Sequence, residues 1–128
     1  MPPPDTPAVL VIGDDPTVLL VIGQMLLRLG CTPLAAPDGG SAVETYRAQA
    51  GRVALVLLDV GLCGTHVENT LRALRELDPA LRCCLMVGSV PQGLQSLVAH
   101  WEGGVLYKPF TLDDLAEVLP ARARHPTQ

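Results

Sequence analysis

Four charged side chains each follow a short apolar run of the chain. Asp14 and Asp15 come directly after one run, Asp59 closes a second and Lys108 follows a third. Converging carboxylates repel one another unless a divalent cation lies among them, and Mg²⁺ takes oxygen ligands and often bridges to a phosphoryl group. A lysine at the same place pairs with phosphate oxygens. These residue types therefore suit transfer of a phosphoryl group onto a carboxylate, with Asp59 as the expected nucleophile because it ends the most buried run.

The apolar runs alternate with segments of helical pattern. Asp15 before Pro16 is typical of a helix start, and Gly30 of a helix end. Alternation of this kind predicts an α/β protein with a doubly wound, five-stranded parallel sheet, whose functional groups gather at the carboxyl ends of the strands. The expected strands cover residues 8–12, 32–36, 53–58, 81–87 and 105–107, and the expected helices cover residues 16–29, 39–50, 65–77, 91–101 and 112–119.

Composition and charge indicate one globular domain. With 48% hydrophobic and 17% charged residues the chain can bury a core, and we expect a single domain over residues 8–120. A flexible, proline-rich N-terminus over residues 1–7 and a C-terminal tail over residues 121–128 are expected to flank it. The net charge of -4, the absence of a basic block and the four aromatic residues argue against nucleic-acid binding.

Cysteine usage bears on the compartment. The four cysteines include no Cys-x-x-Cys pair, so reduced thiols in a cytoplasmic protein are expected rather than a zinc site or a disulfide framework. The longest apolar stretch, residues 18–29, is interrupted by Gly23, Gln24 and Arg28 and is too short to cross a membrane. No membrane partner is therefore expected.

Several short motifs, in this order and spacing, resemble the receiver domain of two-component response regulators. The resemblance rests on Val9 to Pro16, Leu55 to Val60 and Lys108-Pro109-Phe110, with Pro37-Asp38-Gly39 and Leu77-Asp78-Pro79 in support. It implies a flavodoxin-like (βα)5 fold with strand order 2-1-3-4-5. It also implies a domain that binds Mg²⁺ and receives a phosphoryl group from a histidine kinase or a histidine phosphotransfer protein, without turning over a separate substrate as an enzyme does.

The resemblance assigns roles residue by residue. Asp59 matches the phosphoacceptor, and Lys108 matches the lysine that pairs with the phosphoryl group. Asp14 falls on the second acid of the family's metal-binding pair, so Asp14, Asp15 and Asp59 are the candidate metal ligands. Gly13 falls where the first acid of that pair belongs.

Two further positions depart from the family pattern. The resemblance places Val87 where receivers carry a threonine or serine hydroxyl that moves to the phosphoryl group, with Ser89 as a stand-in for phosphate binding. It places Val105 at the aromatic switch position. With Gly13, these departures predict a receiver whose metal affinity and switching are weakened, because coupling phosphorylation to shape needs the hydroxyl and the ring.

The first expected helix is unusually apolar. No charge precedes Arg28, and an exposed apolar strip on a helix suggests a contact surface. In receivers this helix docks against the kinase or phosphotransfer helices, so we expect a partner surface here or self-association into a homodimer. The residues expected to face the sheet are Val18, Val21, Ile22, Met25 and Leu29, and those expected to form the partner surface are Leu19, Leu20 and Leu27.

Other classes of protein explain the sequence less well. Phosphatases of the haloacid dehalogenase type carry a second acid two residues after the nucleophile, where this chain has Gly61. A flavodoxin-type cofactor site would need a Ser/Thr- and Gly-rich loop after the first strand. The remaining alternative is a degenerate pseudo-receiver, a protein-interaction module that works without phosphorylation; Gly13, Val87 and Val105 are consistent with it.

Overall fold

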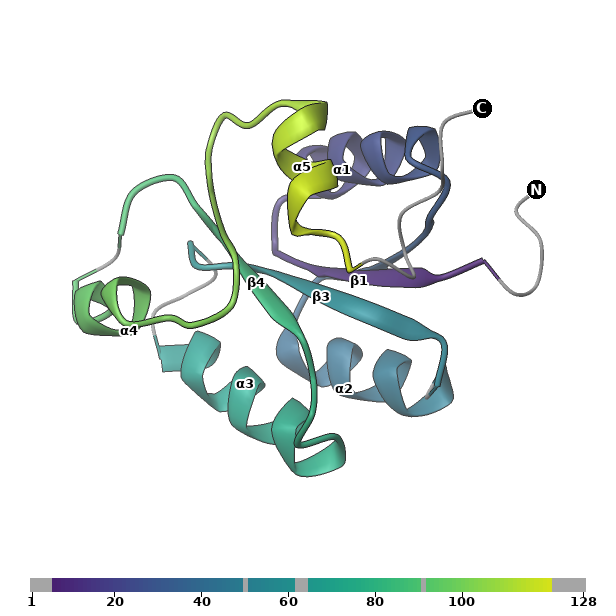
Figure 1. Ribbon diagram of the computed structural model, residues 1–128. Helices are drawn as coiled ribbons and strands as arrows, with labels where there is room; N and C mark the ends of the chain where they lie inside the picture. Colours follow the sequence, from purple (N-terminus) through teal and green to yellow (C-terminus); the bar gives the residue numbers. More distant parts are fainter. Residues whose placement is uncertain (1–5, 50, 62–64, 91, 121–128) are drawn as a thin grey trace.

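The computed structural model describes residues 6–49, 51–61, 65–90 and 92–120. The proposed tail, most of the proposed N-terminal segment and Cys63 lie outside these residues. Five parallel strands form one sheet in the order β2-β1-β3-β4-β5, as expected (Figure 1). The elements are β1 (Ala8–Ile12), α1 (Pro16–Arg28), β2 (Thr32–Ala36), α2 (Gly39–Ala48), β3 (Val53–Asp59), α3 (Thr65–Leu77), β4 (Cys83–Val87), α4 (Gln95–Ala99), β5 (Val105–Tyr107) and α5 (Leu112–Val118).

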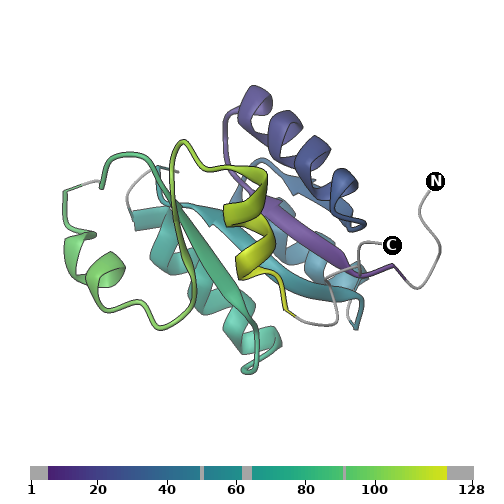
Figure 2. The same cartoon turned by 45° about the horizontal axis from the view of Figure 1, so that its top comes forward.

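Helices cover both faces of the sheet. In Figure 1, α1 and α5 lie above the strands, and α2 and α3 lie below them; Figure 2 shows the first pair again on one side. Each face has its own core of buried side chains, because successive residues of a strand point to opposite faces. Leu10 and Ile12 of β1 belong to the core under α2 and α3, whereas Val9 and Val11 belong to the core under α1 and α5.

The central strands are buried along their whole length. Every residue of β1, β3 and β4 is buried, which explains their continuous apolar sequence. The register pairs Ile12 with Leu58 and Asp59 with Met86. Asp59 therefore lies at the carboxyl edge of the sheet, in the strand between β1 and β4.

The predicted helix boundaries follow the local signals where those are strong. Asp15 caps α1, and Asp38 caps α2. Thr111 and Asp114 form a reciprocal capping box at the start of α5. Gly30 follows α1 with a φ of 84°, the left-handed conformation that glycine adopts most readily.

Several elements are shorter than predicted: α1 ends at Arg28, α2 at Ala48 and α5 at Val118, one or two residues early. The fourth helix is confined to Gln95–Ala99, because Gly93, with a φ of 92°, interrupts the expected helical run. The fourth strand begins at Cys83, not at residue 81. Among the described residues, no helix is long and apolar enough to span a bilayer.

The packing of α1 corrects the predicted helical phase. Leu19, expected to face away, is half-buried and packs against the core under α1 and α5, and Leu26 is fully buried. Val21, expected to face the sheet, is 52% exposed. Leu20 and Leu27 are exposed as predicted, at 63% and 46%. The exposed apolar strip of α1 is therefore Leu20, Val21 and Leu27, a strip turned by about one residue from the predicted one.

Candidate functional site

Backbone hydrogen bonds hold the residues beyond the strands in place. The Gly13 N–H donates to the Ala36 carbonyl at 3.1 Å, which extends the β1–β2 pairing past the end of β1. The Lys108 N–H donates to the Val87 carbonyl at 2.8 Å, which extends the β4–β5 pairing in the same way. The positions after β1 and β5 are thus fixed by the sheet.

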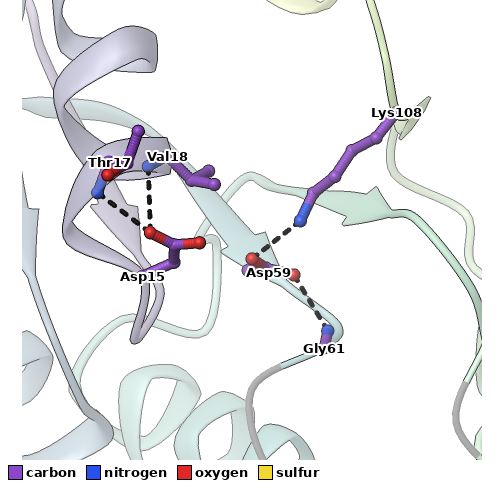
Figure 3. A network of polar contacts seen from close by, with 6 residues as sticks. All are labelled: Asp15, Thr17, Val18, Asp59, Gly61 and Lys108. Atoms are coloured by element: carbon purple, nitrogen blue, oxygen red, sulfur yellow. Dashed lines mark hydrogen bonds and ion pairs between the residues drawn. The ribbon is translucent and has the colours of Figure 1, made fainter.

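The centre of the site is a close ion pair between Asp59 and Lys108. The Lys108 Nζ lies 2.8 Å from Oδ2 of Asp59, and the Gly61 N–H donates to Oδ1 at 2.9 Å (Figure 3). The Asp59 side chain is 7% exposed and that of Lys108 29%. Charge-assisted hydrogen bonds of this kind stabilise a carboxylate that burial would otherwise disfavour. The expected nucleophile and the expected phosphate-binding lysine are therefore in contact.

The two acids after β1 differ in what they do. Asp15 is an N-cap: its Oδ1 accepts from the N–H groups of Thr17 at 2.9 Å and Val18 at 3.4 Å. Asp14 is exposed. Figure 3 shows Asp15 on the α1 side of Asp59 and Lys108 on the β5 side. Asp15 thus has one oxygen committed to α1.

The donor set at this edge fits Mg²⁺ only as a sparse site. Within residues 6–49, 51–61, 65–90 and 92–120, no group of three or more His, Cys, Asp or Glu side chains is arranged to hold a metal ion. Mg²⁺ commonly binds through one or two carboxylates and completes its shell with water and phosphate oxygens. Asp59 supplies one carboxylate at this edge; Asp14, the residue after Gly13, stays the predicted second ligand, and one oxygen of Asp15 makes no contact with α1.

Glycines surround the ion pair. A Cβ on Gly13 would lie 3.3 Å from Cβ and 3.5 Å from Oδ2 of Asp59, and one on Gly61 would lie 3.2 Å from Oδ1. A Cβ on Gly88 would lie 3.6 Å from Cδ of Lys108. Three backbone positions that approach the functional groups therefore carry no side chain.

Gly88 replaces Val87 as the position that faces the site. Val87 is 1% exposed and belongs to the core under α2 and α3, with Leu85 two residues earlier on the same face. A hydroxyl that reaches Lys108 would therefore have to stand at residue 88. The two-residue alternation of the strand carries this signal, since Met86 belongs to the opposite core.

The sequence also singled out Ser89 for phosphate binding and Val105 as a switch position. Ser89 is exposed, and it makes no hydrogen bond with Asp59 or Lys108 in the described part of the chain. Val105 is half-buried and packs against the core under α2 and α3. Tyr107, two residues further along the same face of β5, is 63% exposed.

The three cysteines that the structure describes, Cys31, Cys83 and Cys84, lie away from this edge. Cys83 and Cys84 begin β4 at the opposite edge and point into different cores. Burial raises the pKa of each thiol to about 12, so both stay protonated at neutral pH. Cys31 is also buried, and desolvation raises the pKa of its thiol.

Comparisons with known proteins point to one kind of domain. The transcription factor SKN7 of Saccharomyces cerevisiae is 30% identical over 112 residues, which cover 87% of this chain but 18% of SKN7. The transcriptional regulatory protein PrrA of Mycobacterium tuberculosis is 30% identical over 122 residues, covering 93% of this chain and 51% of PrrA. The chain thus spans 18% of the length of SKN7 and 51% of the length of PrrA. No family model matches it.

Solved structures share the fold. A response regulator receiver domain protein from Clostridium thermocellum superposes with a TM-score of 0.76 at 22% identity, covering 91% of this chain and 94% of the other. The response regulator TrrA from Thermotoga maritima, solved in complex with Mg²⁺ and BeF, superposes with a TM-score of 0.70 at 21% identity, covering 87% and 94%. This chain therefore has the fold of the receiver domains of response regulators, and it is similar in sequence to the regulators SKN7 and PrrA over most of its own length.

Proposed function

We propose that this domain accepts a phosphoryl group on Asp59 from a phosphohistidine donor. The observation that carries the proposal is the 2.8 Å contact between Lys108 Nζ and Asp59 Oδ2 at the carboxyl edge of the sheet. A buried carboxylate beside one ammonium group is suited to attack on phosphorus, because the same ammonium can take up the charge of the phosphoryl oxygens.

The proposed step exchanges one bond for another. A carboxylate oxygen of Asp59 attacks the phosphorus, a P–O bond forms, and the P–N bond to the donor imidazole breaks with its electron pair leaving on nitrogen. Lys108 shifts from the carboxylate to a phosphoryl oxygen. Mg²⁺, held by Asp59 and Asp14, would offset the remaining negative charge. No separate substrate is turned over.

Metal binding and switching are proposed to be weak, because side chains that would support them are missing from this domain. Gly13 contributes no carboxylate, and Asp15 is committed in part to capping α1. Gly88 offers no hydroxyl beside Lys108, and Val105 offers no ring. Phosphorylation therefore changes the charge at the edge more than it changes the shape of the domain.

The proposed docking surface for the donor is the exposed strip of α1. Leu20, Val21 and Leu27 carry no charge, and an apolar groove of about 270 Å³ runs beside them between α1 and the segment after β5. Val21 and Lys108 both line that groove. A histidine kinase or phosphotransfer protein whose histidine reaches Asp59 would therefore cover this strip.

The test is intact mass after incubation with Mg²⁺ and acetyl phosphate. The wild-type protein is expected to gain one phosphoryl group, and Asp59→Asn is expected to gain none. Asp38→Asn is the matched control, because Asp38 also follows a strand at this edge and asparagine still caps α2. A folded wild-type protein that gains no mass, from acetyl phosphate or from a phosphohistidine donor, would contradict the proposal and favour the pseudo-receiver.

A further inference from the structure

A polar hollow lies at the opposite edge of the sheet from Asp59. It has a volume of about 280 Å³ and opens at the amino ends of β4 and β5. Its walls come from the last turn of α3, the start of β4 and the segment between α4 and β5. The side chains that decide its chemistry are Arg75, Arg82, Trp101 and Glu102.

One wall of the hollow is held rigidly. The Trp101 Nε1–H donates to the Cys83 carbonyl at 3.0 Å, which fixes the indole ring against the start of β4. The Arg75 Cζ lies 4.9 Å from the centroid of that ring, a cation–π contact. Gly103 makes this approach possible, since a Cβ there would collide with the Cys83 carbonyl and with Trp101 Nε1. Arg75 is thus oriented before any ligand arrives.

The charges of the hollow do not balance. Neither Arg75 nor Arg82 makes an ion pair with a carboxylate in the part of the chain that the structure describes. Glu102 is the one acidic side chain among the lining residues. Cys84, at the floor, stays a neutral thiol because burial raises its pKa. Two arginines therefore line the hollow against one glutamate, and all three side chains are exposed to solvent.

We propose that this hollow binds a small oxyanion, a phosphate or a carboxylate, between Arg75 and Arg82. A guanidinium presents a planar fork of N–H donors that matches two oxygens of either group. An arginine already stacked on an aromatic ring loses less side-chain freedom on binding than a free one. This site is separate from the phosphoacceptor and does not depend on phosphorylation of Asp59.

Trp101 is the only tryptophan of the chain, so its fluorescence reports on this hollow directly. The protein is titrated in metal-free, reducing buffer with inorganic phosphate, and in a second arm with succinate, against sodium chloride at equal ionic strength. The expected result is a saturable change in fluorescence with phosphate, succinate or both, and none with chloride. The two arms identify whether phosphate or carboxylate is preferred.

Four variants locate the binding. Arg82→Gln, which leaves the Arg75–Trp101 contact in place, is expected to weaken binding about tenfold, because it removes one of the two charge-assisted contacts to the oxyanion. Arg75→Gln is expected to weaken it similarly, with calorimetry as the readout since that variant alters the indole environment. Glu102→Gln is expected to tighten it. Arg72→Gln is the control, an exposed arginine of α3 outside the hollow.

Two results would overturn the proposal. The first is a wild-type protein whose fluorescence changes linearly, or not at all, with both oxyanions. The second is an effect of Arg72→Gln as large as that of Arg82→Gln, which would reduce the binding to general attraction by surface charge.

Discussion

The ends of the strands at the carboxyl edge of the sheet differ in the side chains that they carry. At the ends of β3 and β5, Asp59 and Lys108 are in contact at 2.8 Å, and the Gly61 N–H donates to the second carboxylate oxygen. At the ends of β1 and β4, Gly13 and Gly88 bring backbone without a side chain close to the same pair. The ends of β3 and β5 thus carry a complete reactive pair, whereas the positions after β1 and β4 that approach it are open.

This difference separates two properties that a receiver domain combines. Accepting a phosphoryl group depends on a nucleophile and a nearby cation, which Asp59 and Lys108 supply. Holding a metal ion strongly and converting the new phosphate into a change of shape depend on side chains around that pair. We therefore expect acceptance to survive in this protein while metal affinity and switching are reduced.

The largest effect is expected from disrupting the Asp59–Lys108 ion pair. Lys108→Gln removes the ammonium group beside Asp59, and the rate of phosphorylation by acetyl phosphate should fall about 10- to 100-fold, since hydrogen bonds between charged groups are worth about 1.5–3 kcal/mol. The rate should fall less in Lys108→Arg, because this variant keeps the positive charge. Intact mass against time gives both rates, and an unchanged rate for Lys108→Gln would remove the basis of the comparison.

Next in size are the two acids after β1. Asp14→Asn should weaken Mg²⁺ binding about tenfold, because a lost charged contact costs on the order of 1.5 kcal/mol. Asp15→Asn should change it little, since asparagine caps a helix as well as aspartate does. Calorimetric titration with Mg²⁺ measures both. Equal losses in the two variants would make Asp15 a metal ligand rather than a cap.

A smaller effect is expected from filling the open position beside Lys108. Gly88→Ser should strengthen binding of beryllium fluoride with Mg²⁺ about two- to tenfold, because one added hydrogen bond contributes about 0.5–1.5 kcal/mol. Val87→Thr is the matched control: its hydroxyl would enter the core under α2 and α3, lower the free energy of unfolding by about 1–3 kcal/mol and bring no gain in binding. The reverse ranking would return the hydroxyl position to residue 87.

Substitutions in the exposed strip of α1 are expected to have the smallest effect on the reactivity of Asp59. Leu20→Glu should leave phosphorylation by acetyl phosphate unchanged and slow phosphorylation by a phosphohistidine protein several-fold, because Leu20 is 63% exposed on the proposed docking surface. Leu77→Glu is the control, an exposed leucine on α3. Equal rates for all three proteins with the phosphohistidine donor would exclude α1 as the docking surface.

Features that depend on residues close together in the sequence, such as the starts of helices, could be predicted from the sequence. Asp15 and Thr111 start helices through side chain to backbone contacts with residues two or three positions away, and both caps were predictable. Asp59 and Lys108 were predictable as a pair because parallel strands share a carboxyl edge.

Side-chain direction at the ends of elements was less predictable. A one-residue change in register reverses the face of a strand position, and this is the difference between Val87 and Gly88. A rotation of α1 by about one residue likewise exchanged Leu19 with Val21. Packing against neighbouring elements sets the side-chain directions at the end of β4 and on α1. The order of residues along the chain does not show which elements will be neighbours.

The central claim is that the end of β1 lacks one of two acidic metal ligands, because Gly13 carries no side chain, while the Asp59–Lys108 pair at the ends of β3 and β5 is complete. Calorimetric Mg²⁺ titration of the wild-type protein beside Gly13→Asp tests it most directly, with thermal unfolding of both to check that the new side chain is accommodated. We predict Mg²⁺ binding about tenfold tighter in Gly13→Asp, from one added charged contact of on the order of 1.5 kcal/mol. Wild-type protein that binds Mg²⁺ as tightly as a folded Gly13→Asp would contradict the claim.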